Sequence, residues 1–147
     1  MIAVKLVRLI ESHAEQLARG LIEKLHADIR ATGMRKVPAH ELQLRAYDVY
    51  HNFSDWLLNK TESDIERQYV AIGARRASQG VPLSDLVYAI LAVKEHLWEF
   101  LRREGLVDRA LELYQELQLF QLVDVFFDRA IYFAVAGYER ARAARAA

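Results

Sequence analysis

The segment from about residue 107 to 143 constrains the fold more than any other part of this 147-residue chain. Apolar residues recur along it at steps of three and four, which is the spacing of one helical face. A second apolar set lies elsewhere round the same helix and consists of Leu119, Leu122, Phe126 and Phe133. A helix that is apolar on all sides must be buried on all sides. It therefore lies at the centre of the domain, or one of its faces is covered by another subunit, and this second set then lies in or near a dimer interface.

The same helix is expected to be unusually long. At about 1.5 Å per residue it extends roughly 50 Å, which is more than a domain of this size needs. Its end, ERARAARAA, is strongly helix-forming and contains no stop signal. We expect one helical domain over residues 1–147, whose C-terminal end can continue into a linker helix in a longer protein.

The rest of the chain has the same helical period. We predict further helices over about 3–31, 39–60, 62–79 and 82–104. Thr61 and Asp64 form a capping signal at the start of the third of these. No segment shows the alternation that is typical of a strand. The prediction is an all-α fold of about five helices with a long C-terminal helix. The helices form either an antiparallel bundle or a non-haem globin-like arrangement, because pattern does not set crossing angles.

Gly80 and Pro82 mark a helix junction between the segments 62–79 and 82–104. Glycine tolerates the left-handed conformation that commonly ends a helix. Proline cannot continue a helix but is well placed at the entrance to the next one. We therefore expect one helix to stop at Gly80 and the next to start at Pro82.

Arg76 interrupts an apolar face of the helix that precedes this junction. The earlier residues on that face are Ile65, Tyr69 and Ile72. A buried guanidinium is tolerated only when it is paired and hydrogen-bonded. Asp124 lies on the apolar stripe of the last helix, and Asp128 lies beside that stripe one turn further on. We therefore predict a buried ion pair of Arg76 with Asp124 or Asp128.

Other interpretations of this region stay open. The aliphatic stem of Arg76 can lie at the edge of the core while its charged head reaches water. Arg75 and Arg76 can instead bind an anionic ligand, because arginine suits carboxylate and phosphate geometry. A small-molecule cavity between the helices is a further alternative, since bundle cores commonly hold pockets.

Metal and haem sites have weak support in the sequence. Glu23 and His26 have the spacing found in di-iron bundles, but the second such pair is missing. An all-helical chain of this length can hold haem through a histidine, and His51 and His96 are the candidates. A boundary histidine is the more economical interpretation of His96, which lies between the main apolar rows. We expect no cofactor.

Composition bounds the remaining function classes. There is no cysteine, which excludes disulfides and thiolate chemistry and makes a cytoplasmic location the default. Lys+Arg and Asp+Glu are both 20, so we expect no nucleic-acid partner that relies on net positive charge. A local basic patch stays open. No apolar run approaches the ~20 residues of a membrane span. No phosphate-binding glycine loop or nucleophile elbow occurs, so we do not expect an enzyme.

The sequence resembles the RsbRD N-terminal domain family, the helical input domain of RsbT co-antagonist proteins. The resemblance covers most of the chain and is carried by the Arg-Ala-x-x-Gly-x-Pro-Leu element (residues 76–83) and the Phe-Asp-Arg-Ala element (residues 127–130). Related domains precede sensor histidine kinases and PucR-like transcription regulators. No ligand residues can be carried over from the family pattern.

The resemblance implies an N-terminal sensory or regulatory domain that controls an output domain or a partner protein in a signal transduction pathway. Related input domains of stress-response proteins are similar to globins that have lost haem, and they dimerise. The expected function is signal input by a homodimer, with the last helix coupled to the output module. A small-molecule or haem-binding globin-like sensor is the alternative. The sequence leaves open whether the chain is an excised domain or a short stand-alone version.

Overall fold

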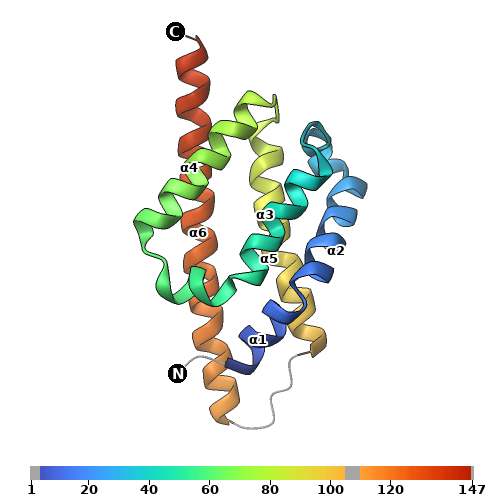
Figure 1. Ribbon diagram of the computed structural model, residues 1–147, viewed down its shortest axis with the longest axis vertical. Coiled ribbons are helices and arrows are strands. Elements are labelled where there is room, and N and C mark those ends of the chain that lie inside the picture. The colour runs from blue at the N-terminus through green and yellow to red at the C-terminus, as the bar shows by residue number, and fades with distance from the viewer. Residues whose placement is uncertain (1–3, 105–109, 147) are drawn as a thin grey trace.

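The structure is a computed structural model that describes residues 4–104 and 110–146. These residues form helices and connecting segments without a strand, so the all-α prediction is confirmed (Figure 1). Eight helical elements are present in the described residues, where about five were expected. They are α1 (Val4–Ser12), α2 (Ala14–Ala27), the 3-10 helix η1 (Ile29–Lys36), α3 (Ala39–His51), the π-helix η2 (Asp55–Asn59), α4 (Glu62–Ser78), α5 (Leu83–Glu104) and α6 (Ala110–Ala146).

The helix expected over 3–31 is divided at two points that the apolar pattern does not reveal. His13 separates α1 from α2, and its Nδ1 lies 2.8 Å from the carbonyl oxygen of Leu9. Asp28 has an extended backbone and ends α2, and its carboxylate accepts a hydrogen bond of 2.8 Å from the Arg30 amide. After the first break Ala14 and Leu17 are buried, so the apolar row continues into α2, whereas Ile29 directly after the second break is exposed.

The helix expected over 39–60 is also divided. α3 ends at His51, and η2 follows after a short connection. In η2 the amide of Lys60 donates to the carbonyl of Asp55 at 2.8 Å, which is the wider i to i−5 spacing of a π-helix. The capping box at the start of α4 is present as predicted. The Thr61 amide donates to the Asp64 carboxylate at 2.9 Å, and the Asp64 amide donates to the Thr61 hydroxyl at 3.2 Å.

The junction predicted at Gly80 and Pro82 is confirmed. α4 ends at Ser78 and α5 begins at Leu83. Gly80 has a φ of 76° and is the one positive-φ residue in the described part of the chain. The amide of Val81 donates to the carbonyl of Arg76 at 3.1 Å, which satisfies one of the free carbonyls at the end of α4.

α6 extends along the molecule beside α4, and its C-terminal end projects beyond the other helices (Figure 1). α4 and α6 run in the same direction. Glu62 near the start of α4 pairs with Arg129, while Ala77 near its end accepts from Arg145. α5 connects the two, so the arrangement departs from a bundle in which every neighbouring pair is antiparallel.

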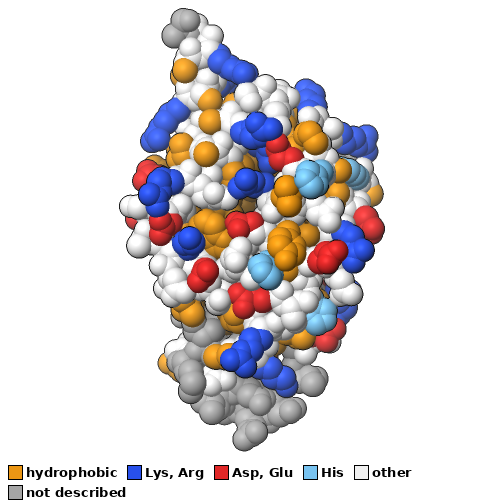
Figure 2. Space-filling view, in the orientation of Figure 1, with side chains coloured by type: hydrophobic (Ala, Val, Ile, Leu, Met, Phe, Trp, Pro, Cys, Tyr) orange, Lys and Arg blue, Asp and Glu red, His pale blue; other side chains and the backbone are white. Residues whose placement is uncertain are grey.

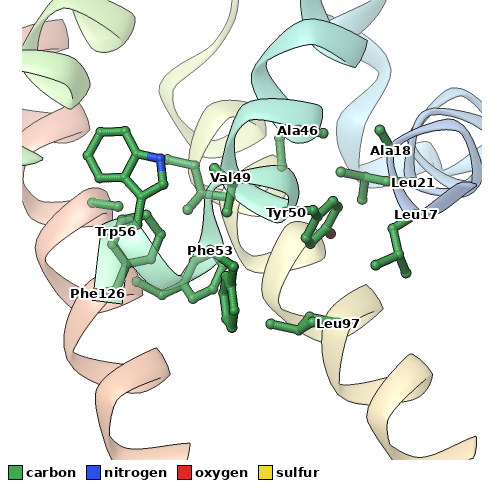
Figure 3. Packing of buried hydrophobic residues seen from close by; sticks show 14 of the residues in the cluster. Leu17, Ala18, Leu21, Ala46, Val49, Tyr50, Phe53, Trp56, Leu97 and Phe126 are labelled. Carbon is green, nitrogen blue, oxygen red and sulfur yellow. The ribbon is translucent and has the colours of Figure 1, made fainter. Parts of the chain in front are cut away.

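The core lies between α2, α3, α5 and α6 and contains several large aromatic side chains (Figure 3). Tyr50 of α3 and Phe53, which lies between α3 and η2, are fully buried, and the Tyr50 hydroxyl donates to the Val93 carbonyl at 2.9 Å. Phe126 of α6 packs against Trp56, with ring centroids 5.7 Å apart. Among the described residues, no helix combines the length and hydropathy that a membrane span requires.

Candidate functional site

Arg76 lies in a hydrogen-bonded cluster that joins α4 to α3. Its surface is only 2% exposed. Its Nη1 forms an ion pair with Oε2 of Glu41 and donates to Oε1 of Gln79 at 2.9 Å. Gln79 in turn donates to Oε2 of Glu41 at 3.0 Å, and Nε of Arg75 donates to Oε1 of Glu41 at 2.7 Å. One carboxylate therefore accepts hydrogen bonds from three side chains. We refer to Glu41, Arg75, Arg76 and Gln79 as the Arg76 cluster.

These contacts keep the Glu41 carboxylate charged. The hydrogen bond from Arg75 is the largest cause that lowers the pKa of Glu41 to about 2, with Gln79 and Arg76 contributing and partial burial opposing them. Burial lowers the pKa of Arg76, and the hydrogen bond to Glu41 opposes that change. Arginine is ordinarily protonated far above neutral pH, so Arg76 remains a cation. The cluster therefore contains a buried charge pair whose polar atoms are well satisfied.

Arg76 forms a buried ion pair as predicted, but the prediction that its partner is Asp124 or Asp128 is wrong, because the partner is Glu41. Both aspartates are exposed on α6. Asp124 Oδ1 lies 3.9 Å from Nζ of Lys94, and the Asp124 side chain is 57% exposed. Helical spacing places these acids on or beside the apolar stripe, but the end of α4 lies beside α3 and the later turns of α6. The burial of Arg76 also excludes the alternative in which its head reaches water.

The Arg76 cluster adjoins the α4–α5 junction, and α6 is attached to the same junction. The hydroxyl of Tyr138 donates to the Val81 carbonyl at 2.5 Å. Nη1 of Arg145 donates to the Ala77 carbonyl at 3.2 Å, and Nζ of Lys36 donates to the Gly80 carbonyl at 2.9 Å. The last four carbonyl groups of an α-helix have no hydrogen-bond partner within the helix and need one from elsewhere. Here side chains from α6 and η1 bind carbonyls at this terminus and in the junction.

α4 and α6 contact each other backbone to backbone at two glycines. A Cβ atom added to Gly73 would lie 1.9 Å from the carbonyl oxygen of Ala134, and one added to Gly137 would lie 2.2 Å from that of Val70. No side chain other than hydrogen fits at either position. The C-terminal part of α6 is therefore fixed closely against α4.

A cavity of about 70 Å³ lies inside the bundle between α2, α3, α4, α5 and α6. Most of its lining is apolar, including Leu21, Ala46 and Val49 (Figure 3). Four polar side chains line it as well, and all four come from α3 and α4: Arg45, Gln68, Tyr69 and Arg76. On the surface seen in Figure 2, basic and acidic side chains are interspersed with hydrophobic ones.

The candidate histidines do not line this cavity. His51 is exposed and stacks on Tyr47, with ring centroids 4.9 Å apart. His96 is buried, and its Nδ1 lies 2.8 Å from Nζ of Lys24. Burial, and then the charge of Lys24, lowers the pKa of His96, so its neutral ring accepts the hydrogen bond from lysine.

Glu23 and His26 do not form part of a metal-binding group of residues. Within residues 4–104 and 110–146, no three His, Asp or Glu side chains lie where they could share a metal ion. The spacing that suggested a di-iron half-site is therefore a feature of an ordinary helix surface.

Two of the four residues predicted for a dimer interface lie in the core of the single chain. Leu119 is 0% exposed and Phe126 is 2% exposed, so both are covered by the chain's own helices. Leu122 and Phe133 are half-buried. The prediction is wrong for these two because other parts of the same chain already cover them, and Phe126 is covered by Trp56 of η2 and Tyr69 of α4. From residue 114 to 146, the large apolar residues that α6 exposes are Tyr114, Leu117, Val125 and Tyr132.

Sequence reasoning missed Glu41, Gly73 and Gly137. Glu41 resembles any acidic residue in the first turn of a helix, and nothing in its local pattern points to an arginine 35 residues later. The two glycines did carry a signal. An isolated glycine inside a helix is unfavourable by about 1 kcal/mol relative to alanine, which usually indicates close packing.

Comparison with known proteins gives one family. The model of the RsbT co-antagonist protein RsbRD N-terminal domain matches residues 15–147. No curated protein and no solved structure matches the chain significantly.

Proposed function

Because the chain belongs to the family of RsbT co-antagonist protein RsbRD N-terminal domains, we propose that it is the signal-input domain of a signal transduction protein. In this proposal it acts as a homodimer, has no catalytic activity and passes its signal through α6 to an output module or partner. The observation that carries the proposal is the division of α6 into two sides. One side packs on α4, and the other presents apolar residues to solvent.

The exposed apolar residues of α6 form a single stripe. Tyr114, Leu117, Val125 and Tyr132 are each more than half exposed, and Val125 and Tyr132 reach 53% and 66%. With 3.6 residues per turn, these four positions fall within about a quarter of the helix circumference. Gln121 and Asp128 fill the gaps along the same stripe. A long apolar stripe with few charges suits a helix that pairs with its counterpart in a second copy.

Attachment of α6 to α4 supports coupling along the helix. The glycine contacts and the bonds of Tyr138 and Arg145 fix α6 near its C-terminal end. Residues 142–146, which include Arg145, are exposed. A signal that favours one packing of the domain over another would thus alter the helix that leads out of it.

Sedimentation or light scattering of the 147-residue chain at about 100 μM tests the dimer, since a stable interface has a Kd well below that concentration. We expect a dimer that becomes monomeric when Val125 and Tyr132 are both changed to Glu. Leu44→Glu is the matched control, because Leu44 is a similarly exposed apolar residue on α3. It should remain dimeric. A monomeric wild-type chain, or equal disruption by the control, contradicts the proposal.

A small-molecule sensor is the second candidate, and the interior cavity is the observation that favours it. Pockets between the helices of a bundle commonly hold ligands. The haem form of this candidate gains no support from the cavity, since its lining includes no histidine to serve as an iron ligand.

A further inference from the structure

The interior cavity shares two of its lining residues with a second pocket. This outer pocket lies between α3, η2 and α4, has a volume of about 510 Å³, and is bounded by both polar and apolar groups. Arg45 and Gln68 line the outer pocket and the interior cavity alike. The two spaces therefore lie close together, with Arg45 and Gln68 in the walls of both.

The charge at this boundary is positive. The outer pocket is lined by the cations Arg45, Lys60 and Arg67 and by the carboxylates Asp48 and Asp64. Arg67 forms an ion pair with Asp64, and Asp48 accepts a hydrogen bond of 2.9 Å from Asn52. Arg45 forms no hydrogen bond or ion pair within the described part of the chain, although it lines both spaces.

Arg45 itself is exposed, but it lies near the buried cation Arg76. Burial is the main cause that lowers the pKa of Arg76, and the positive charge of Arg45 lowers it further. Arg76 uses only Nη1 in its two hydrogen bonds to described residues. Glu41 already balances the charge of Arg76, so Arg45 is the guanidinium lining this cavity whose charge no ion pair among the described residues balances.

Trp56 independently indicates a ligand, because its buried N–H donor has no hydrogen-bond acceptor among the described residues. Its indole Nε1 is buried and has no hydrogen-bond partner among the described residues, whereas nearly all buried polar groups have one. Trp56 lines the outer pocket. Its nitrogen is on the side of the ring toward Val49, which lines the interior cavity (Figure 3). The unsatisfied N–H therefore lies beside the region where the two spaces meet.

We propose that this site binds a small monocarboxylate, with the carboxylate near Arg45, Gln68 and Trp56 and a short apolar group in the interior cavity. Arginine and indole N–H groups are donors that suit a carboxylate. The cavity of about 70 Å³ is smaller than the one of about 150 Å³ that accepts benzene, so only a short alkyl group fits. This inference rests on the second candidate function and is independent of the dimer.

Calorimetric titration of the 147-residue chain tests the proposal with two series of probes. One is the straight-chain carboxylates from acetate to octanoate, and the other is the primary alcohols of the same chain lengths. We expect short carboxylates of intermediate length to bind at least about tenfold more tightly than the matching alcohols, as a charge-assisted hydrogen bond requires. Affinity should fall again for the longest chains.

Arg45→Gln should weaken carboxylate binding about tenfold and leave alcohol binding unchanged. Because Arg45 is exposed, the variant is expected to fold normally. Arg67→Gln is the matched control, since Arg67 lines only the outer pocket and already pairs with Asp64. Trp56→Phe removes the unsatisfied N–H together with one of the two fused rings, and should weaken carboxylate binding about threefold or more. Because Trp56 is buried, the smaller ring should also lower the midpoint of thermal unfolding, so binding is compared at a temperature where the variant is folded.

The possible outcomes test the ligand class, the binding site and the small-molecule function separately. If alcohols bind as tightly as carboxylates, or if Arg45→Gln has no effect, the ligand class is wrong while the small-molecule pocket stands. If Arg45→Gln and Arg67→Gln weaken binding equally, the effect is one of general surface charge and the site is wrong. If neither series binds, the inference and the second candidate function both fail.

Discussion

Gly73 of α4 and Gly137 of α6 each face the backbone of the opposite helix at one crossing. The space at each glycine is occupied by a carbonyl oxygen of the partner helix, from Ala134 and Val70 respectively. Because backbone atoms cannot move aside as a side chain can, the spacing of α4 and α6 is set by these two positions.

Gly73→Ala and Gly137→Ala should each lower the free energy of unfolding by about 3 kcal/mol, because the added methyl forces the helices apart. Urea denaturation followed by circular dichroism measures the change. Gly20→Ala is the matched helical control, since its methyl would meet only side-chain atoms of His96, at 3.1 Å and 3.2 Å. We expect it to differ from wild type by less than about 1 kcal/mol. Equal losses for all three variants would show that close backbone contact is not the cause.

Glu41→Gln should destabilise the protein by about 3 kcal/mol, because it leaves the Arg76 cation buried without its carboxylate. Asp124→Asn should change stability by less than about 0.5 kcal/mol, since that carboxylate is exposed. Denaturant midpoints of the two variants decide between the Glu41 pairing and the pairing expected from sequence. A larger loss for Asp124→Asn would refute the pairing with Glu41.

Stability should fall steeply in acid partly because of Glu41. Its pKa is about 2 in the folded protein and 4.5 in the unfolded chain. A carboxyl group with a lowered folded pKa stabilises the protein above its unfolded value, and this contribution is lost as pH falls from about 4.5 to about 2. One fifth of the side chain is exposed, so we expect a contribution of about 2 kcal/mol after screening. The stability of wild type and Glu41→Gln should converge over this range. Parallel curves would contradict the assignment.

Tyr138→Phe should release the α4–α5 junction from α6 because it removes the donor to the Val81 carbonyl. The expected loss of stability is about 1 kcal/mol. Hydrogen exchange should show faster exchange at residues 79–83 than in wild type. Tyr132→Phe removes an exposed hydroxyl from the same helix and should leave exchange there unchanged. If both variants behave alike, the hydrogen bond does not hold the junction.

Periodicity in the sequence determined which helical faces are buried but not which helices cover them. It placed Arg76 on a buried face, as found, because the face depends only on residues within one helix. Its partner Glu41 lies on α3, and finding it requires the arrangement of three helices. The dimer residues failed in the same way. Leu119 and Phe126 are apolar enough for an interface, but only the arrangement of the helices in space shows that the chain itself covers them.

The breaks between helices could be predicted only where the residues at the break itself carry a capping or stop signal. Thr61, Asp64, Gly80 and Pro82 carry capping and stop signals in their own side chains or backbone freedom, and each prediction agrees with the structure. The break at His13 has no such signal, because its residue type is common inside helices. The interior cavity was foreseen only as a general property of bundles, since the volume left between side chains depends on how all the helices pack.

The glycine contact gives α6 the geometry of an asymmetric lever. Gly137 lies 27 residues from Ala110 and 9 residues from Ala146, so the two arms are roughly 40 Å and 14 Å long at 1.5 Å per residue. Because the backbones already touch there, α6 tilts about that point more easily than it moves toward α4. A tilt displaces the long arm about three times as far as the short one. A tilt of α6 as a rigid rod would therefore turn both ends through the same angle, while the C-terminal end moves only about a third as far as the N-terminal end.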